Sequence, residues 1–201
     1  IVYGLMTLER MPMTDRLAVA LSAYGEYLLK TFIPISLTGL YPLPKTITLW
    51  KPLSGAVVLA VVTAIAIRRR KEWPWLIMGW FWFCGMIVPV SGLSQAGPQA
   101  LADRFTYLPH VGLFIALVWT THDILATRIR LHSHAVLIAV VTLLAALAGL
   151  SWKQTTHWSS PETFWSRSLA VLGESNSAAL YELAVIYQDQ KRYKEALEYY
   201  Q

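Results

Sequence analysis

The chain of 201 residues is 55% hydrophobic and only 14% charged, with a mean hydropathy of +0.43. This composition leaves too little polar surface to coat a soluble globule of that size, so we expect a membrane protein. The net charge of +5 comes from basic residues clustered beside apolar runs, chiefly residues 68–71 with Arg128 and Arg130. Such clusters are typical of membrane topology signals and exclude a nucleic-acid-binding surface.

Five apolar stretches are long enough to be membrane spans, since a helix needs roughly 20 largely apolar residues to cross the hydrocarbon. The predicted spans cover residues 17–37, 52–67, 73–90, 107–125 and 135–150. We therefore predict an all-α fold, with a polytopic transmembrane helical bundle over residues 1–152 and a helical region outside the membrane over residues 153–201.

The basic clusters also predict the orientation of the spans, because short loops rich in lysine and arginine stay in the cytoplasm. Residues 68–71 and the Arg128/Arg130 loop then mark the inside. The loops over residues 41–51 and 91–104, together with everything after Trp152, are predicted to be extracytoplasmic. Most of the nine tryptophans lie near span ends, where their amphipathic rings prefer the headgroup zone.

Two charges lie within the first predicted span. Glu26 and Lys30 are four residues apart, so they share a helix face and are able to neutralise each other within the membrane. A charge in a span indicates a functional site by default, whereas a paired charge near the interface only snorkels to the headgroups. The sequence leaves both interpretations open.

The composition changes after the fifth span, where three short helices are predicted. Ser159, Ser160, Pro161 and Glu162 form a typical helix start, followed by a helix to about Leu172. The last 25 residues, 177–201, read as two amphipathic helices. Their small and aromatic residues match the spacing of a partial tetratricopeptide repeat, with Lys191 where the turn more often has glycine. The predicted packing residues are Leu180, Leu183, Ala184, Tyr187, Ala196 and Tyr200. The alternative is an unrelated helical hairpin.

A family resemblance is carried by the strings QAGPQALADRFTYLPHVGLFI, WFWFCGMIVPVSGL and YLLKTFIPISLTGLYPLP, and by the order of spans followed by repeats. The chain resembles bacterial multi-span membrane proteins with carboxyl-terminal tetratricopeptide repeats, which are similar to TMTC-type protein O-mannosyltransferases and the glycosyltransferase superfamily C. The resemblance implies an enzyme of the bacterial inner membrane that moves a sugar from a polyprenyl-phosphate donor to an extracytoplasmic acceptor. It also implies that the catalytic acid lies upstream of Ile1, so the chain is expected to be a fragment that is inactive alone.

The residues at the outer end of the fourth span suggest how the chain contacts substrate. Arg104 is a candidate for a forked pair with the carrier phosphate, and Tyr107 offers a hydroxyl at headgroup level. Asp103 is a candidate to orient Arg104 or to hold a divalent cation, the one possible cofactor. The alternative is that Asp103 and Arg104 form a structural pair that caps the helix. Gln95 and Gln99 are candidates for contacts with sugar hydroxyls.

No metal site is predicted, since His132 and His134 have no carboxylate or cysteine near them and Cys84 is alone. The expected partners are the lipid bilayer, a polyprenyl-phosphate-linked sugar, and a protein or peptide on the repeats. Two other functions fit the same pattern: a non-enzymatic membrane-anchored scaffold that uses its repeats, and an envelope polysaccharide polymerase or ligase.

Overall fold

The computed structural model describes residues 12–39, 41–43, 46–91, 93, 99–129, 133–173 and 176–200, and it is almost entirely helical. The chain divides into two compact units, described separately below. The first unit comprises residues 1–35 and 40–130, and the second comprises residues 36–39 and 131–201. The sequence predicts that the chain leaves the membrane at residue 152. The packing of helices does not test this boundary, so it stays a prediction.

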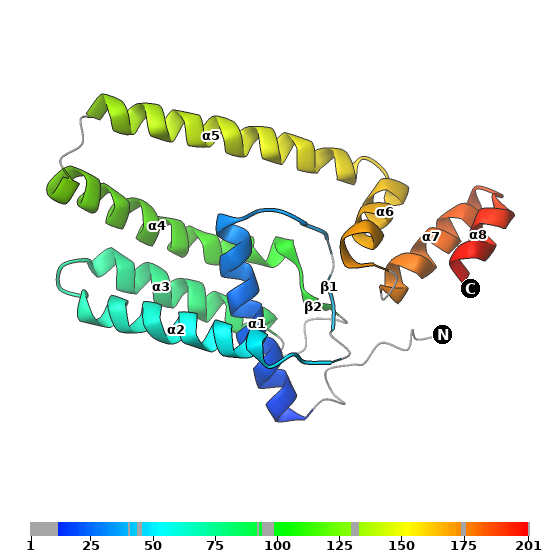
Figure 1. The fold of residues 1–201 in the computed structure, drawn as a ribbon, viewed down its shortest axis with the longest axis horizontal. Helices are drawn as coiled ribbons and strands as arrows, with labels where there is room; N and C mark the ends of the chain where they lie inside the picture. The colour runs from blue at the N-terminus through cyan, green and yellow to red at the C-terminus, as the bar shows by residue number, and fades with distance from the viewer. Residues whose placement is uncertain are drawn as a thin grey trace. The chain divides into compact units, whose positions relative to one another are not determined.

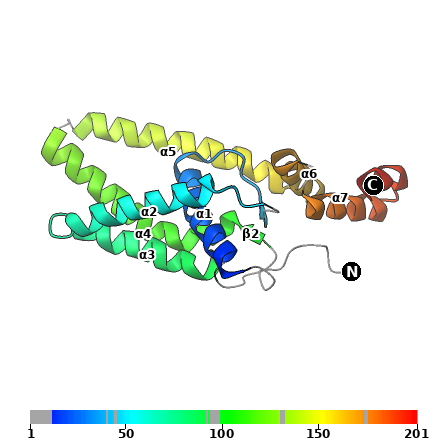
Figure 2. The same cartoon turned by 60° about the horizontal axis from the view of Figure 1, so that its bottom comes forward.

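The first unit is a bundle of four helices (Figures 1 and 2). Helices α2, α3 and α4 run side by side, and α1 crosses them at a steep angle. A short 3₁₀ turn, η3 (Asp103–Thr106), leads into α4, and a π-helical segment, η4 (Ile124–Ile129), follows it. The helix bounds are Met13–Phe32 for α1, Trp50–Arg68 for α2, Pro74–Ile87 for α3 with 3₁₀ continuation η2 (Val88–Val90), and Tyr107–Asp123 for α4.

Three helices in the described residues are long and apolar enough to span a membrane: Trp50–Arg68, Asp103–Thr127 and His134–Trp158. The shorter apolar helix Pro74–Val90 joins them. These four cover the second to fifth predicted spans. The first predicted span, 17–37, needs correction, because α1 ends at Phe32. Ile33 leaves the helical region since Pro34 follows it, and the residue before a proline is disfavoured there.

Glycines allow the helices of the first unit to approach closely. A Cβ on Gly55 of α2 would overlap the carbonyl of Leu21 on α1, and Gly25 faces it across the same crossing. A Cβ on Gly79 of α3 would overlap the carbonyl of Gly112 on α4. Small residues at helix crossings are characteristic of membrane bundles, in which packing and not water exclusion drives association.

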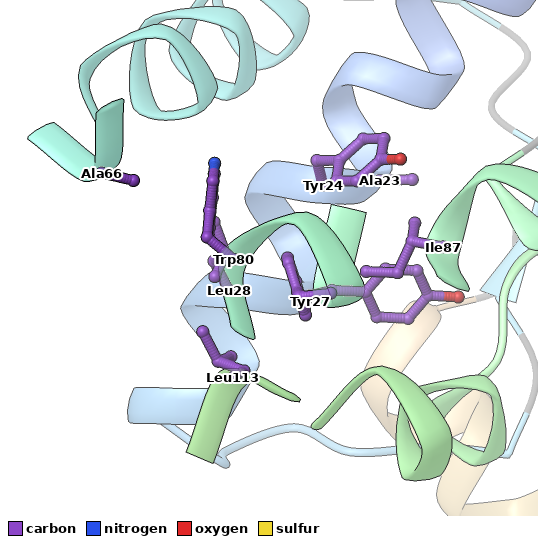
Figure 3. Packing of buried hydrophobic residues seen from close by; sticks show 9 residues of the cluster. Ala23, Tyr24, Tyr27, Leu28, Ala66, Trp80, Ile87 and Leu113 are labelled. Carbon is purple, nitrogen blue, oxygen red and sulfur yellow. The ribbon is translucent and has the colours of Figure 1, made fainter. Parts of the chain in front are cut away.

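The centre of the first unit is an aromatic cluster with residues from α1, α2, α3 and α4 (Figure 3). Its polar atoms are satisfied across helices: the Tyr24 hydroxyl donates to the carbonyl of Cys84 at 2.6 Å, and the Trp80 indole donates to Thr63 Oγ1 at 2.8 Å. At the other end of the bundle, the Trp73 indole donates to Asp123 Oδ2 at 2.8 Å. Each bond fixes one helix against another where water is scarce. The cluster comprises Ala23, Tyr24, Tyr27, Leu28, Ala66, Trp80, Phe83, Ile87 and Leu113.

The first helix of the second unit is α5 (Ser133–Thr155), an Ala/Leu/Val helix with no buried residue in its apolar stretch. A 3₁₀ turn, η5 (Thr156–Trp158), leads to α6 (Pro161–Leu172), α7 (Ser177–Asp189) and α8 (Tyr193–Tyr200). The helix start predicted at Ser160 is confirmed: its hydroxyl accepts the amide of Thr163 at 3.1 Å, in a capping box with Pro161 at the first position.

Helices α7 and α8 form the predicted hairpin, and α6 packs against α7. Asn176 caps α7 by accepting the amide of Ala179 and donates to the buried hydroxyl of Ser168 on α6. The turn between α7 and α8 places Lys191 at φ 63°, in the left-handed region that favours glycine. This conformation explains why glycine is the more usual residue at this turn, a place that Lys191 takes here.

We expect Gly55→Ala to weaken the first unit, because the added methyl overlaps backbone of α1 that has no room to move. The expected loss is about 1–3 kcal/mol of unfolding free energy, read as a lower melting temperature of the purified protein in detergent. Gly85→Ala on α3 is the matched control, since nothing lies within 4 Å of its Cβ position. Equal melting temperatures for the two variants would contradict the close crossing.

Candidate functional site

The loops at one end of the first unit meet in a two-stranded ladder. Strand β1 (Tyr41–Pro42) pairs antiparallel with β2 (Gln99–Leu101), and Tyr41 lies opposite Leu101. The ladder brings the segment after α1 beside the segment that enters α4. Residues about 60 apart in sequence, Tyr41 and Asp103, therefore become neighbours.

A hydrogen-bonded bridge joins these segments. The Lys30 ammonium donates to the Tyr41 hydroxyl at 2.9 Å, and that hydroxyl donates to Asp103 Oδ2 at 3.2 Å. The Lys30 Nζ also lies 4.4 Å from the centroid of the Tyr41 ring. We call Lys30, Tyr41 and Asp103 the polar cluster. Tyr41 is buried, so its hydroxyl couples a cation and a carboxylate where water competes weakly.

Two further contacts fix α1 against the start of α4. The amide of Ala102 donates to the Tyr27 hydroxyl at 3.3 Å, immediately before Asp103. Thr31 Oγ1 lies 2.9 Å from His110 Nε2 and donates its own proton to the carbonyl of Tyr27. His110 Nε2 must therefore be the donor to Thr31, which assigns the Nε2–H form. His110 is thus a hydrogen-bonded helix residue.

Arg104 and Tyr107 lie on the surface beside the polar cluster. The Arg104 guanidinium is exposed, with its Cζ 5.2 Å from the centroid of the Phe105 ring. Tyr107 is 78% exposed at the first turn of α4. Both side chains are able to meet an incoming ligand, whereas Asp103 is half-buried and directed at Tyr41.

The structure changes the expected pairing of the two charges on α1. Glu26 and Lys30 do not neutralise each other by direct contact. Lys51 at the start of α2 donates to Glu26 Oε1 at 3.0 Å, while Lys30 turns to Tyr41.

Gln95 and the side chain of Gln99 lie outside the described residues, and the backbone of Gln99 forms part of β2. Among the described residues, no group of three histidine, cysteine, aspartate or glutamate side chains is able to hold a metal ion. Only the Tyr41 hydroxyl separates Asp103 from the Lys30 ammonium, and this positive charge opposes the binding of a divalent cation.

Sequence reasoning found Asp103, Arg104 and Tyr107 but missed Tyr41 and the bridging role of Lys30. Lys30 drew attention as a charge within an apolar run, yet no spacing rule relates it to Asp103. Tyr41 follows the string SLTGL and precedes a proline, which signals only a turn. Their proximity depends on the ladder of β1 and β2, whose strands are too short to show a pattern.

The hairpin of the second unit buries several predicted packing residues. Leu183, Ala184, Tyr187 and Ala196 are buried, and Leu180 is half-buried. Tyr200 instead remains 49% exposed, with its ring 6.1 Å from that of Tyr181. The buried side of α8 is completed by Tyr199, whose ring stacks on Tyr187.

A charged network holds α6 to this hairpin. The Tyr187 hydroxyl donates to Glu162 at 3.2 Å, and Arg192 lies over the Tyr187 ring and contacts both Glu162 and Glu195. Desolvation and the bond to Glu162 raise the pKa of Tyr187 to about 12. Hydrogen bonds from Arg192 lower the pKa of Glu195. The network is structural, since Glu162 joins α6 to Tyr187 and Arg192 of the hairpin.

Two curated proteins that share one name are similar to this chain. The chain is 28% identical over 192 residues to "Protein O-mannosyl-transferase TMTC1" of Mus musculus, which covers 90% of this chain and 20% of that protein. The Homo sapiens protein of the same name is 27% identical over 167 residues, covering 81% and 19%. No family model and no solved structure matches the chain. The chain thus spans about a fifth of the length of these curated relatives.

We expect Tyr41→Phe to separate Lys30 from Asp103 and to destabilise the first unit by roughly 1.5–3 kcal/mol, the usual range for hydrogen bonds to charged groups. The readout is the melting temperature in detergent, or hydrogen exchange of β1 and β2. Tyr107→Phe is the control, because that hydroxyl is exposed. A Tyr41→Phe variant as stable as Tyr107→Phe would show that the bridge contributes nothing.

Proposed function

We propose that this chain is part of a membrane glycosyltransferase that takes a sugar from a polyprenyl-phosphate donor and transfers it to an acceptor outside the cytoplasm. The observation that carries the proposal is the similarity to protein O-mannosyl-transferases over nine tenths of the chain. The polar cluster supports it, because it places the Lys30 cation and an oriented carboxylate beside Arg104, at the end of a helix that could span a membrane. The proposed location is the bacterial inner membrane, as the sequence resemblance implies.

In this proposal Arg104 holds the phosphate of the lipid carrier. A guanidinium forms two parallel hydrogen bonds to a phosphate, and its exposure beside the headgroup zone lets a membrane-bound ligand reach it. Lys30 adds positive charge from the buried side. As the sugar leaves, negative charge develops on the phosphate, and preorganised cations stabilise that charge more than they stabilise the intact donor.

Asp103 and Tyr41 are positioning residues in this scheme. Asp103 fixes the Tyr41 hydroxyl, which in turn fixes the Lys30 ammonium, so the cation stays in place without a ligand. A preorganised cation avoids the entropy loss of ordering a lysine side chain on binding. Tyr107 offers a hydroxyl at the surface for the headgroup or the sugar.

We propose further that the Asp103 end of α4 and the α6–α8 region lie on the extracytoplasmic side. Two apolar helices, α4 and α5, separate Asp103 from Ser177, so both positions belong on one side if each helix crosses the membrane. One helix, α3, separates Asp103 from the basic residues 68–71. These basic residues favour the cytoplasm.

The hairpin of α7 and α8 is proposed to be a tetratricopeptide repeat that binds a protein or peptide. Buried alanines on both helices, Ala184 and Ala196, let the helices pack closely, as the repeat requires. Apolar side chains also remain on the hairpin surface, where a neighbouring repeat or a partner would cover them. These are Tyr181, Tyr193, Leu197 and Tyr200. The same hairpin supports the second candidate function, a membrane-anchored scaffold without enzymatic activity.

Substitution in the full-length protein separates the two candidates. We expect Arg104→Lys and Asp103→Asn each to reduce sugar transfer from a polyprenyl-phosphate donor by roughly tenfold or more, because each removes a charged hydrogen bond to phosphate or its positioning partner. Transfer is measured in membranes with a radiolabelled sugar donor. Arg70→Lys, on an exposed arginine of the basic loop, is the matched control.

A scaffold would give a different result. Neither substitution would change any sugar transfer, and partner capture by the repeats would remain. Unchanged transfer in both variants, with normal protein levels in the membrane, would remove the assigned role of the polar cluster.

A further inference from the structure

A groove of about 400 Å³ lies between α1 and α2, apart from the polar cluster. Apolar side chains of both helices form its walls, including Leu29 and Phe32 of α1 and Val58 and Val62 of α2. Leu29 and Phe32 are 54% and 62% exposed. Since α2 is long and apolar enough to span a membrane, this groove opens toward lipid, and lipid chains fill such a space more favourably than water.

Among the residues that the structure describes, one ion pair lies at the mouth of the groove. Lys51 Nζ donates to Glu26 Oε1 at 3.0 Å, and the two side chains are 48% and 27% exposed. Both belong to the groove lining, together with Trp50 in the first turn of α2. A tryptophan and a lysine at the end of an apolar helix mark the level of the lipid headgroups. The groove thus leads from headgroup level into the hydrocarbon.

The ion pair is able to donate and to accept further hydrogen bonds. Lys51 uses one of its three N–H groups on Glu26, and among the described residues Glu26 Oε2 accepts no hydrogen bond. The free N–H groups suit a phosphate oxygen. The free carboxylate oxygen suits an ammonium donor.

We propose that this groove is a binding site for phosphatidylethanolamine, with one acyl chain between α1 and α2, the phosphate on Lys51 and the primary ammonium on Glu26. Charge complementarity selects this headgroup. Its negative phosphate meets the positive Lys51, and its positive ammonium meets the negative Glu26. A choline headgroup has no N–H to donate to Glu26, and a glycerol headgroup has no positive charge. An anionic lipid would meet the carboxylate of Glu26 without compensation.

The site also suggests how bound lipid affects the fold. Glu26 and Lys30 lie one turn apart on α1, and Lys30 belongs to the polar cluster. A lipid that fills the groove therefore contacts α1 one turn away from the residue that belongs to the polar cluster. The inference rests on the groove alone and does not require the proposed transfer reaction.

Native mass spectrometry of the detergent-purified protein tests the site. The protein is mixed with equal amounts of phosphatidylethanolamine, phosphatidylcholine and phosphatidylglycerol that carry identical acyl chains. We expect the phosphatidylethanolamine adduct to exceed each of the others by roughly tenfold or more, the effect of one hydrogen bond to a charged group. Val58→Trp, which fills the groove, should abolish this excess.

Two variants make the result specific. Val57→Trp places the same side chain on an exposed position of α2 outside the groove and should keep the excess. Glu26→Gln should reduce the preference over phosphatidylcholine while chain binding remains. Equal adducts of the three lipids, an excess of phosphatidylglycerol, or an unchanged excess in Val58→Trp would each overturn the assignment. None of these outcomes bears on sugar transfer, which Arg104→Lys tests separately.

Discussion

The structure depends on lipid as the solvent of its long helices. The apolar window of α5 has no buried residue, and those of α2 and α4 are only 17% and 22% buried within the chain. Helices of this kind satisfy their backbone hydrogen bonds internally, but their side chains gain nothing from water. In a bilayer the acyl chains already solvate the same apolar surface. The folding problem that remains is how to hold helices together without a hydrophobic driving force, and the chain solves it with glycine contacts and indole or phenol hydrogen bonds between helices.

Under this constraint α1 takes a special role. It is the most polar of the helices in the first unit, and it carries both Glu26 and Lys30. Its buried face, with Tyr24 and Tyr27, joins the central aromatic cluster. Its two charges then serve different partners: Lys30 completes the polar cluster, and Glu26 forms the mouth of the groove with Lys51. One helix therefore links the proposed phosphate site to the proposed lipid site.

Much of the fold could be predicted from the sequence, since apolar length and helix caps are local properties. The helices at residues 52–67, 73–90, 107–125 and 135–150, and the start at Ser160, are all present in the structure. The end of α1 was predicted five residues late because the apolar run continues after the helix stops before Pro34. Only part of the candidate site could be predicted from the sequence. Arg104 stood out as a basic residue at a span end, but Tyr41 reaches Asp103 through a ladder of five residues that leaves no sequence pattern.

The most direct test of the account is the sidedness of the full-length protein in intact cells, with single cysteines in a background where Cys84 and every other cysteine are replaced by serine. A membrane-impermeant maleimide should label Tyr107→Cys beside the polar cluster and Ser177→Cys at the start of the hairpin. Arg70→Cys should react only after the membrane is permeabilised. Labelling of Arg70→Cys in intact cells, or protection of Ser177→Cys, would contradict the crossing of the membrane by α3, α4 and α5, and with it the proposed site.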